Sequence, residues 1–123
     1  MNGYLFITGL IFAAVGLYAL LDPVAALGQP LGLHIEAVNS FNQLRGSAGG
    51  VPLAVGIFLI VSARKPALAR PALWTVALLL GGLELGRLAS IAVDGLPGRI
   101  IWIYMGAEIF GLVQAVFWLR RPG

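Results

Sequence analysis

Four long apolar stretches take up most of this chain and leave only short segments between them. Their approximate ranges are residues 3–21, 35–63, 71–93 and 100–119. A helix needs about 20 apolar residues to cross about 30 Å of hydrocarbon, and each stretch is close to that length. Charged residues make up only 11% of the chain, whereas about 25% is usual in soluble domains. The sequence therefore predicts one membrane domain, residues 1–123, with four spanning helices.

Proline, glycine and aspartate predict where these helices begin, bend and end. Span three is expected to begin at Pro71, because the missing N–H costs nothing in a first helical turn. Pro52 lies inside span two and is expected to kink it and to free a carbonyl one turn earlier. Asp22, Pro23 and Gly28 predict a short helix after span one, which Asp22 caps and Gly28 ends. The expected fold class is all-α: an antiparallel integral membrane four-helix bundle with a short outer interfacial helix between spans one and two.

The charges at the span ends predict the orientation in the membrane. The basic residues lie between spans two and three and after span four: Arg64, Lys65, Arg70, Arg120 and Arg121. The opposite side carries mostly acidic residues, namely Asp22, Glu36 and Asp94, with Arg99. Because cytoplasmic loops carry the excess of Lys and Arg, both termini are expected in the cytoplasm. Nucleic acid is not an expected partner, because these basic residues lie at the ends of apolar runs.

Charged residues also occur inside the spans, where they are expensive. An ionised side chain at the bilayer centre costs at least about 2.5–3.5 kcal/mol, and such residues most often mark a site or a pathway. At about 1.5 Å of rise per residue, Glu84 and Glu108 should lie at nearly one level, with Arg87 and Arg45 further out. Polar neighbours on the same helix faces complete a candidate ligand-binding pocket. Its expected residues are Asn42, Arg45, Glu84, Arg87, Ser90, Tyr104 and Glu108.

Each of these charges also has a purely structural interpretation. Glu84 and Arg87 are spaced to pair within one helix, and Arg45 is able to extend to the outer headgroups. His34, alone in a loop, is expected to be solvated. The chain has no cysteine, which excludes disulfides and thiolate chemistry, and no metal site is expected.

Three functions are compatible with such a pocket. The first is a binding protein or accessory subunit of a membrane complex that holds a lipid, a quinone or a similar amphiphile. The second is a small membrane enzyme with a glutamate as general acid or base. The third, a proton-coupled transporter, ranks last because no pair of broken helices is visible. The expected partners are thus the lipid bilayer, an amphiphilic small molecule, and complex subunits or a second copy of the chain; no cofactor and no catalytic residue is assigned.

Several short motifs resemble those of a known family. They are N-x-x-R-G-x-x-G-G from Asn42 to Gly50, G-R-L-A-S and D-G-x-P in span three and its turn, and a glutamate midway along span four. The pattern resembles a widespread bacterial family of small four-span membrane proteins of unknown function, similar to the DoxX group. The resemblance implies a four-helix bundle in the bacterial inner membrane and no established reaction. DoxX relatives are associated with quinone-linked sulfur oxidation and membrane redox complexes, and that role carries over by analogy only.

Overall fold

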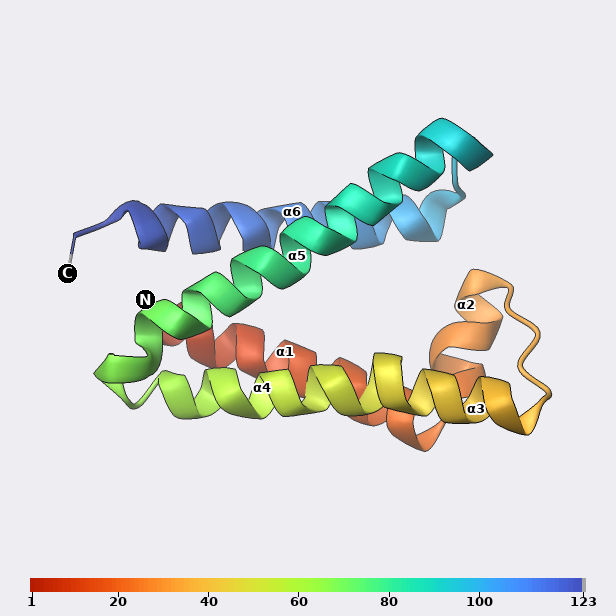
Figure 1. Ribbon diagram of the computed structural model, residues 1–123, viewed down its shortest axis with the longest axis horizontal. Coiled ribbons are helices and arrows are strands. Elements are labelled where there is room, and N and C mark those ends of the chain that lie inside the picture. The colour runs from red at the N-terminus through yellow and green to blue at the C-terminus, as the bar shows by residue number, and fades with distance from the viewer. Residues whose placement is uncertain (123) are drawn as a thin grey trace. The chain divides into compact units, whose positions relative to one another are not determined.

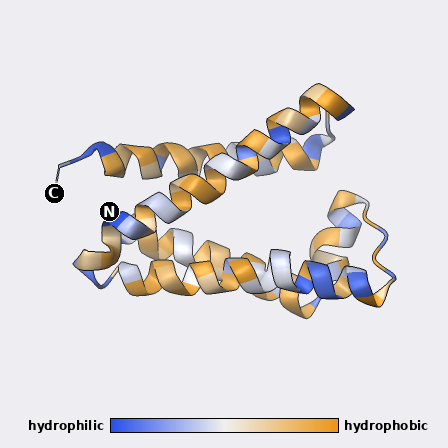
Figure 2. Cartoon of the chain, in the orientation of Figure 1, coloured by the Kyte–Doolittle hydropathy of each residue, from blue (hydrophilic) through white to orange (hydrophobic). Residues whose placement is uncertain are grey.

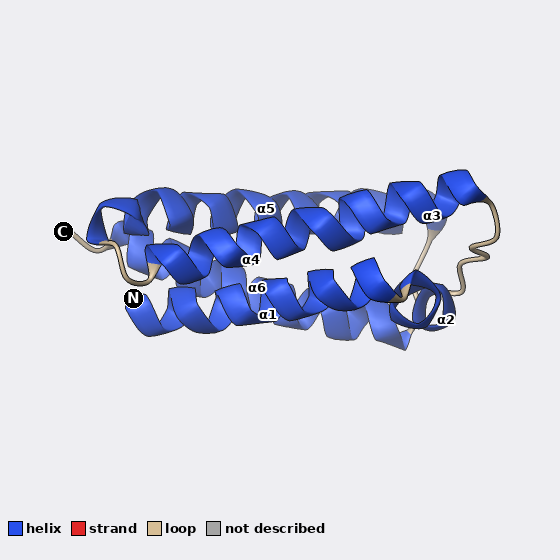
Figure 3. Cartoon of the chain, turned by 90° about the horizontal axis from the view of Figure 1, so that it is seen from below, coloured by secondary structure: helices blue, strands red, loops and turns tan. Residues whose placement is uncertain are grey.

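The computed structural model describes residues 1–122, and the secondary structure of these residues is helical without any strand (Figures 1 and 3). The elements are α1 (Asn2–Leu21), the π-helical η1 (Val24–Gly28), α2 (Gln29–Leu31), α3 (Val38–Leu44), the π-helical η2 (Arg45–Gly50), α4 (Val51–Ser62), α5 (Pro66–Asp94) and α6 (Arg99–Arg120). Four helical stretches are long and apolar enough to cross a membrane: Asn2–Leu21, Val38–Ser62, Pro66–Asp94 and Arg99–Arg120. The all-α membrane fold class with four spans is thus confirmed.

Large apolar side chains lie mainly on the outside of these helices. Leu85 is 71% exposed and Phe110 is 70% exposed, and Figure 2 shows apolar residues along most of each long helix. Lipid tails are as apolar as leucine, so a membrane helix gains nothing by hiding such residues. The exposed apolar surface therefore supports a lipid bilayer as the surroundings of the chain.

The helices divide into two compact units, residues 2–66 and residues 67–122. In the first unit, α1 packs against η2 and α4 through glycines. A Cβ on Gly9 would lie 2.8 Å from the carbonyl oxygen of Gly56, and one on Gly16 would lie 2.5 Å from that of Gly49. Gly9 faces Gly56, whereas the later Gly16 faces the earlier Gly49. The two helices are therefore antiparallel. Small residues let the two backbones approach this closely.

The second span contains the irregularity that Pro52 predicts. Pro52 has no N–H to donate to the carbonyl four residues earlier. The preceding turn, η2, is π-helical, and the N–H of Val51 donates to the carbonyl of Gly46, five residues back. The turn before Pro52 is thus widened, and the predicted kink of the span stays a prediction.

Two predicted helix ends are wrong. Span three begins at Pro66, so Pro71 lies inside α5. A proline interrupts only the bond to the residue four positions earlier, here Ala67 in the first turn, and the helix continues past it. Gly28 does not end the short outer helix either. That helix continues to Leu31 and ends at Gly32, whose φ of 72° is the left-handed geometry typical of a glycine helix end.

Two other predictions about this region hold, and a third is off by a few residues. The N–H of Ala25 donates to Oδ1 of Asp22 over 3.2 Å, so Asp22 caps the short helix as expected. The second span begins at Val38, slightly later than predicted, because Ala37 before it has an extended backbone. His34 is exposed in the connecting segment, in agreement with the expectation of a solvated side chain.

Candidate functional site

The candidate site lies in the second unit, where α5 and α6 form an antiparallel pair. Near one end, Nη2 of Arg70 donates to the carbonyl of Leu119 over 3.0 Å. In the middle, Leu80 packs against Gly111, where a Cβ would lie 3.0 Å from Cδ1 of the leucine. At the other end the chain reverses through Gly95, whose φ is 99°. This register brings the middle of α5, with its charged residues, beside the middle of α6.

Arg87 of α5 and Glu108 of α6 form a two-point ion pair between the helices. Nε of Arg87 donates to Oε1 of Glu108 and Nη2 donates to Oε2, each over 2.7 Å. The two side chains are 22% and 16% exposed. Bonds between charged groups in this paired geometry are among the strongest hydrogen bonds in proteins. Arg87 thus bonds to Glu108 on the neighbouring helix, and no hydrogen bond within α5 joins it to Glu84 among the residues described.

Glu84 lies beside this ion pair but makes no hydrogen bond to Arg87. It is 7% exposed, and within residues 1–122 neither of its buried carboxyl oxygens has a hydrogen-bond partner. The carboxyl lies close enough to Arg87 and Glu108 to interact with both electrostatically. A buried polar group without a hydrogen bond costs about 1–3 kcal/mol. Arg87 therefore bonds one of two neighbouring carboxyl groups, and the other, Glu84, receives no N–H or O–H donor and lies against the carboxyl of Glu108.

Two further predicted residues lie around this group. The guanidinium carbon of Arg87 lies 5.8 Å from the ring centre of Tyr104, which is within the range of a cation–π contact. The hydroxyl of Ser90 donates to Oδ2 of Asp94 over 2.8 Å. Of the predicted pocket residues, the α5–α6 unit therefore contains Glu84, Arg87, Ser90, Tyr104 and Glu108.

A groove of about 600 Å³ runs beside Arg87 on the same unit. Its polar lining residues are Arg87 and Ser90, and its apolar lining includes Leu78, Leu83 and Ile101. This groove was not predicted from the sequence, although a signal was present. Gly82 and Gly86 line it, nothing lies within 4 Å of a Cβ built on either, and with Ser90 they recur every fourth residue, which places them on one helix face.

The remaining predicted pocket residues, Asn42 and Arg45, belong to the first unit. Nη1 of Arg45 donates to the carbonyls of Leu20 and Leu21, and its guanidinium carbon lies 5.7 Å from the ring centre of Phe41. The last carbonyls of a helix lack partners inside the helix, and a cation placed there is favourable. Arg45 therefore caps the end of α1. Asn42 is exposed on α3.

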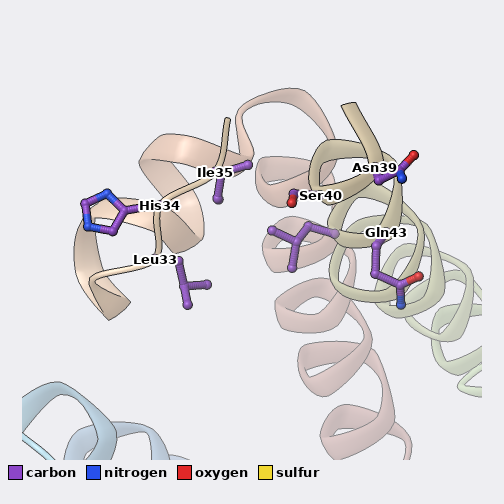
Figure 4. A pocket seen from close by; sticks show the side chains of 7 residues that line it. Leu33, His34, Ile35, Asn39, Ser40 and Gln43 are labelled. Atoms are coloured by element: carbon purple, nitrogen blue, oxygen red, sulfur yellow. The ribbon is translucent and has the colours of Figure 1, made fainter. Parts of the chain in front are cut away.

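A second hollow, of about 400 Å³, lies between the segment after α2 and helix α3 (Figure 4). His34 lies on one side of it, and the side chains of Asn39 and Gln43 lie on the other side and point away. Binding sites depend on polar groups that converge on one place. This hollow does not bring its polar groups together, and the α5–α6 group is the stronger candidate.

These observations define a small multi-pass membrane protein with four candidate spans and a partly buried charged group between the last two. A family model, described as Domain of unknown function (DUF4345), matches residues 1–119. The chain belongs to this family, which confirms the expected membership of an uncharacterised family. No curated protein and no solved structure matches the chain.

Proposed function

We propose that this protein binds an amphiphilic small molecule in the groove of the α5–α6 unit, within a bacterial inner membrane and with both termini in the cytoplasm. It does so alone or as an accessory subunit of a membrane complex. The observation that carries the proposal is Glu84, a buried carboxyl without a hydrogen-bond partner among residues 1–122. Glu84 lies three residues before Arg87, which lines the groove.

A purely structural role accounts poorly for Glu84. The Arg87–Glu108 pair is already satisfied by two hydrogen bonds, and the second carboxyl lies against Glu108, where two like charges repel each other unless one group carries a proton. An ionisable residue inside a span costs at least about 2.5–3.5 kcal/mol and by default suggests function. The presence of Glu84 despite this cost supports a binding site in which Glu84 sets the net charge beside Arg87.

The groove supports an amphiphile in particular. Its lining is mainly apolar, with Arg87 and Ser90 as polar groups, and ligand sites commonly combine a mostly apolar wall with a few polar groups. Binding is favoured over catalysis because neither candidate general acid or base, Glu84 or Glu108, lines the groove, whereas Arg87 and Ser90 do. By analogy with the DoxX group, which this chain resembles, a quinone is one candidate amphiphile and a membrane redox complex is one candidate assembly.

The test compares molecules that co-purify with the parent and with two glycine variants. Gly82→Leu fills the groove, and Gly106→Leu is the matched control, because it adds the same side chain to an open position on α6. Each protein is extracted with its native lipids in a polymer that retains a lipid ring, and its bound molecules are identified by mass spectrometry. An amphiphile enriched with the parent and the control but lost from Gly82→Leu is the expected result. Equal recovery from all three proteins would contradict the proposal.

A further inference from the structure

We infer that the head group of the bound amphiphile is uncharged and carries a carbonyl oxygen, as in a single-chain glycerol ester. This inference rests on the proposed function and adds the chemical class of the ligand. Its starting point is the set of charges and hydrogen-bond donors beside the groove.

The charges beside the groove offer nothing to an anionic head group. Glu108 neutralises Arg87 through two hydrogen bonds, and Glu84 lies beside the pair. The sum of the charges is negative when both carboxyls are ionised and zero when Glu84 carries a proton. Asp94, bonded to the lining residue Ser90, adds another carboxyl nearby. The remaining cation at this end of the unit, Arg99, does not line the groove. A phosphate or carboxylate would lose its hydration and meet no surplus of positive charge.

The hydrogen-bond donors beside the groove suit a neutral acceptor. A guanidinium has five N–H donors, and Arg87 uses two of them for Glu108, so three remain for other acceptors. Ser90 uses its proton to bond Asp94, which leaves the hydroxyl oxygen as an acceptor. A carbonyl next to a free hydroxyl satisfies both residues, because the carbonyl accepts from Arg87 and the hydroxyl donates to Ser90.

The size and lining of the groove suit one hydrocarbon chain. The volume of about 600 Å³ is within the range of small-molecule sites, about 300–1,000 Å³. Leu78 and Leu83 supply apolar wall, and the open positions at Gly82 and Gly86 leave room beside the helix. A monoacylglycerol combines such a chain with an ester carbonyl and hydroxyls.

The experiment compares two probes that share one oleoyl chain and differ in a phosphate: monooleoylglycerol and oleoyl lysophosphatidic acid. The full-length protein in nanodiscs is titrated with each, and binding is followed by native mass spectrometry. Monooleoylglycerol is expected to bind at least about tenfold more tightly, a difference of about 1.4 kcal/mol. Gly82→Leu should abolish this binding, and Gly106→Leu should retain it.

Charge variants test the reason for this preference. Asp94→Asn and Glu108→Gln each remove one negative charge, so both should raise the affinity for lysophosphatidic acid. Asp94 is exposed, which makes its variant a test that does not depend on a buried bond. If lysophosphatidic acid binds the parent as tightly as monooleoylglycerol, or if Asp94→Asn leaves its affinity unchanged, the inference fails while the proposed function stands. If neither probe binds, the inference fails, and recovery of another amphiphile with the parent and Gly106→Leu but not with Gly82→Leu would still support the proposed function.

Discussion

Replacing Arg87 with methionine is expected to destabilise the protein more than replacing Glu108 with glutamine, although the two residues bond each other. Arg87→Met leaves Glu84 and Glu108 together with no guanidinium between them. Glu108→Gln leaves Arg87 beside Glu84, which lies three residues earlier on the same helix, a spacing at which side chains meet. In that variant Arg87 therefore has a second carboxyl available.

The structure sets the size of the difference. Removing one partner of a buried ion pair costs about 3–5 kcal/mol. This range is an upper bound here, because Arg87 and Glu108 are 22% and 16% exposed. In Glu108→Gln, a new bond to Glu84 offsets much of the loss, and the net cost should be about 1–2 kcal/mol, close to that of one hydrogen bond. The two variants should thus differ by roughly 2 kcal/mol.

The free energy of unfolding is measured by titrating dodecyl sulfate into detergent micelles and following helix content by circular dichroism. Leu85→Ala serves as the baseline, because this side chain is 71% exposed. Adding Glu84→Gln to Arg87→Met should restore part of the lost stability, since residues in one ion-paired group are coupled. If Glu108→Gln costs as much as Arg87→Met, Glu84 is not an alternative partner. If the double variant is as unstable as the sum of its single changes, the residues are not coupled.

Three further predictions concern the packing and orientation of the spans. Gly16→Ala should lower the free energy of unfolding by about 1–3 kcal/mol, since the new Cβ meets the backbone of the opposite helix. Gly3→Ala is the control: nothing lies within 4 Å of its new Cβ, so the same unfolding assay should show no loss of stability. Arg45→Gln should loosen the end of α1, which hydrogen exchange would detect as faster exchange at its last turn; unchanged exchange would refute the capping role. A cysteine at the exposed Gln29 should react with an impermeant thiol reagent on intact cells and one at the exposed Lys65 should not, and the opposite labelling would reverse the proposed orientation.

Features that depend only on residues close together in the chain could be predicted from the sequence. Hydropathy and the rise of a helix are local properties, so the four spans were found to within a few residues of their ends. The cap at Asp22 was predicted because it involves residues three positions apart. The two wrong helix ends have one cause. Pro71 and Gly28 are residue types that commonly mark helix boundaries, but α5 begins at the earlier proline, Pro66, and the short helix ends at the later glycine, Gly32. That the two units act together as one four-span domain stays a prediction.

The tertiary structure decided which partner each charged residue takes. From the sequence, two carboxyls were candidate partners of Arg87: Glu84 on its own helix, and Glu108 on the next span at nearly the level of Glu84. Helix periodicity gives the level and face of each residue, but the choice depends on how α6 is rotated and placed against α5 by packing such as that of Leu80 on Gly111. Arg45 caps α1 for the same reason: its acceptor, the carbonyl of Leu20, comes within reach only when glycines let the two helices pack closely. A long side chain finds its partner after the backbones are in place, so its bonds depend on packing between residues far apart in the sequence.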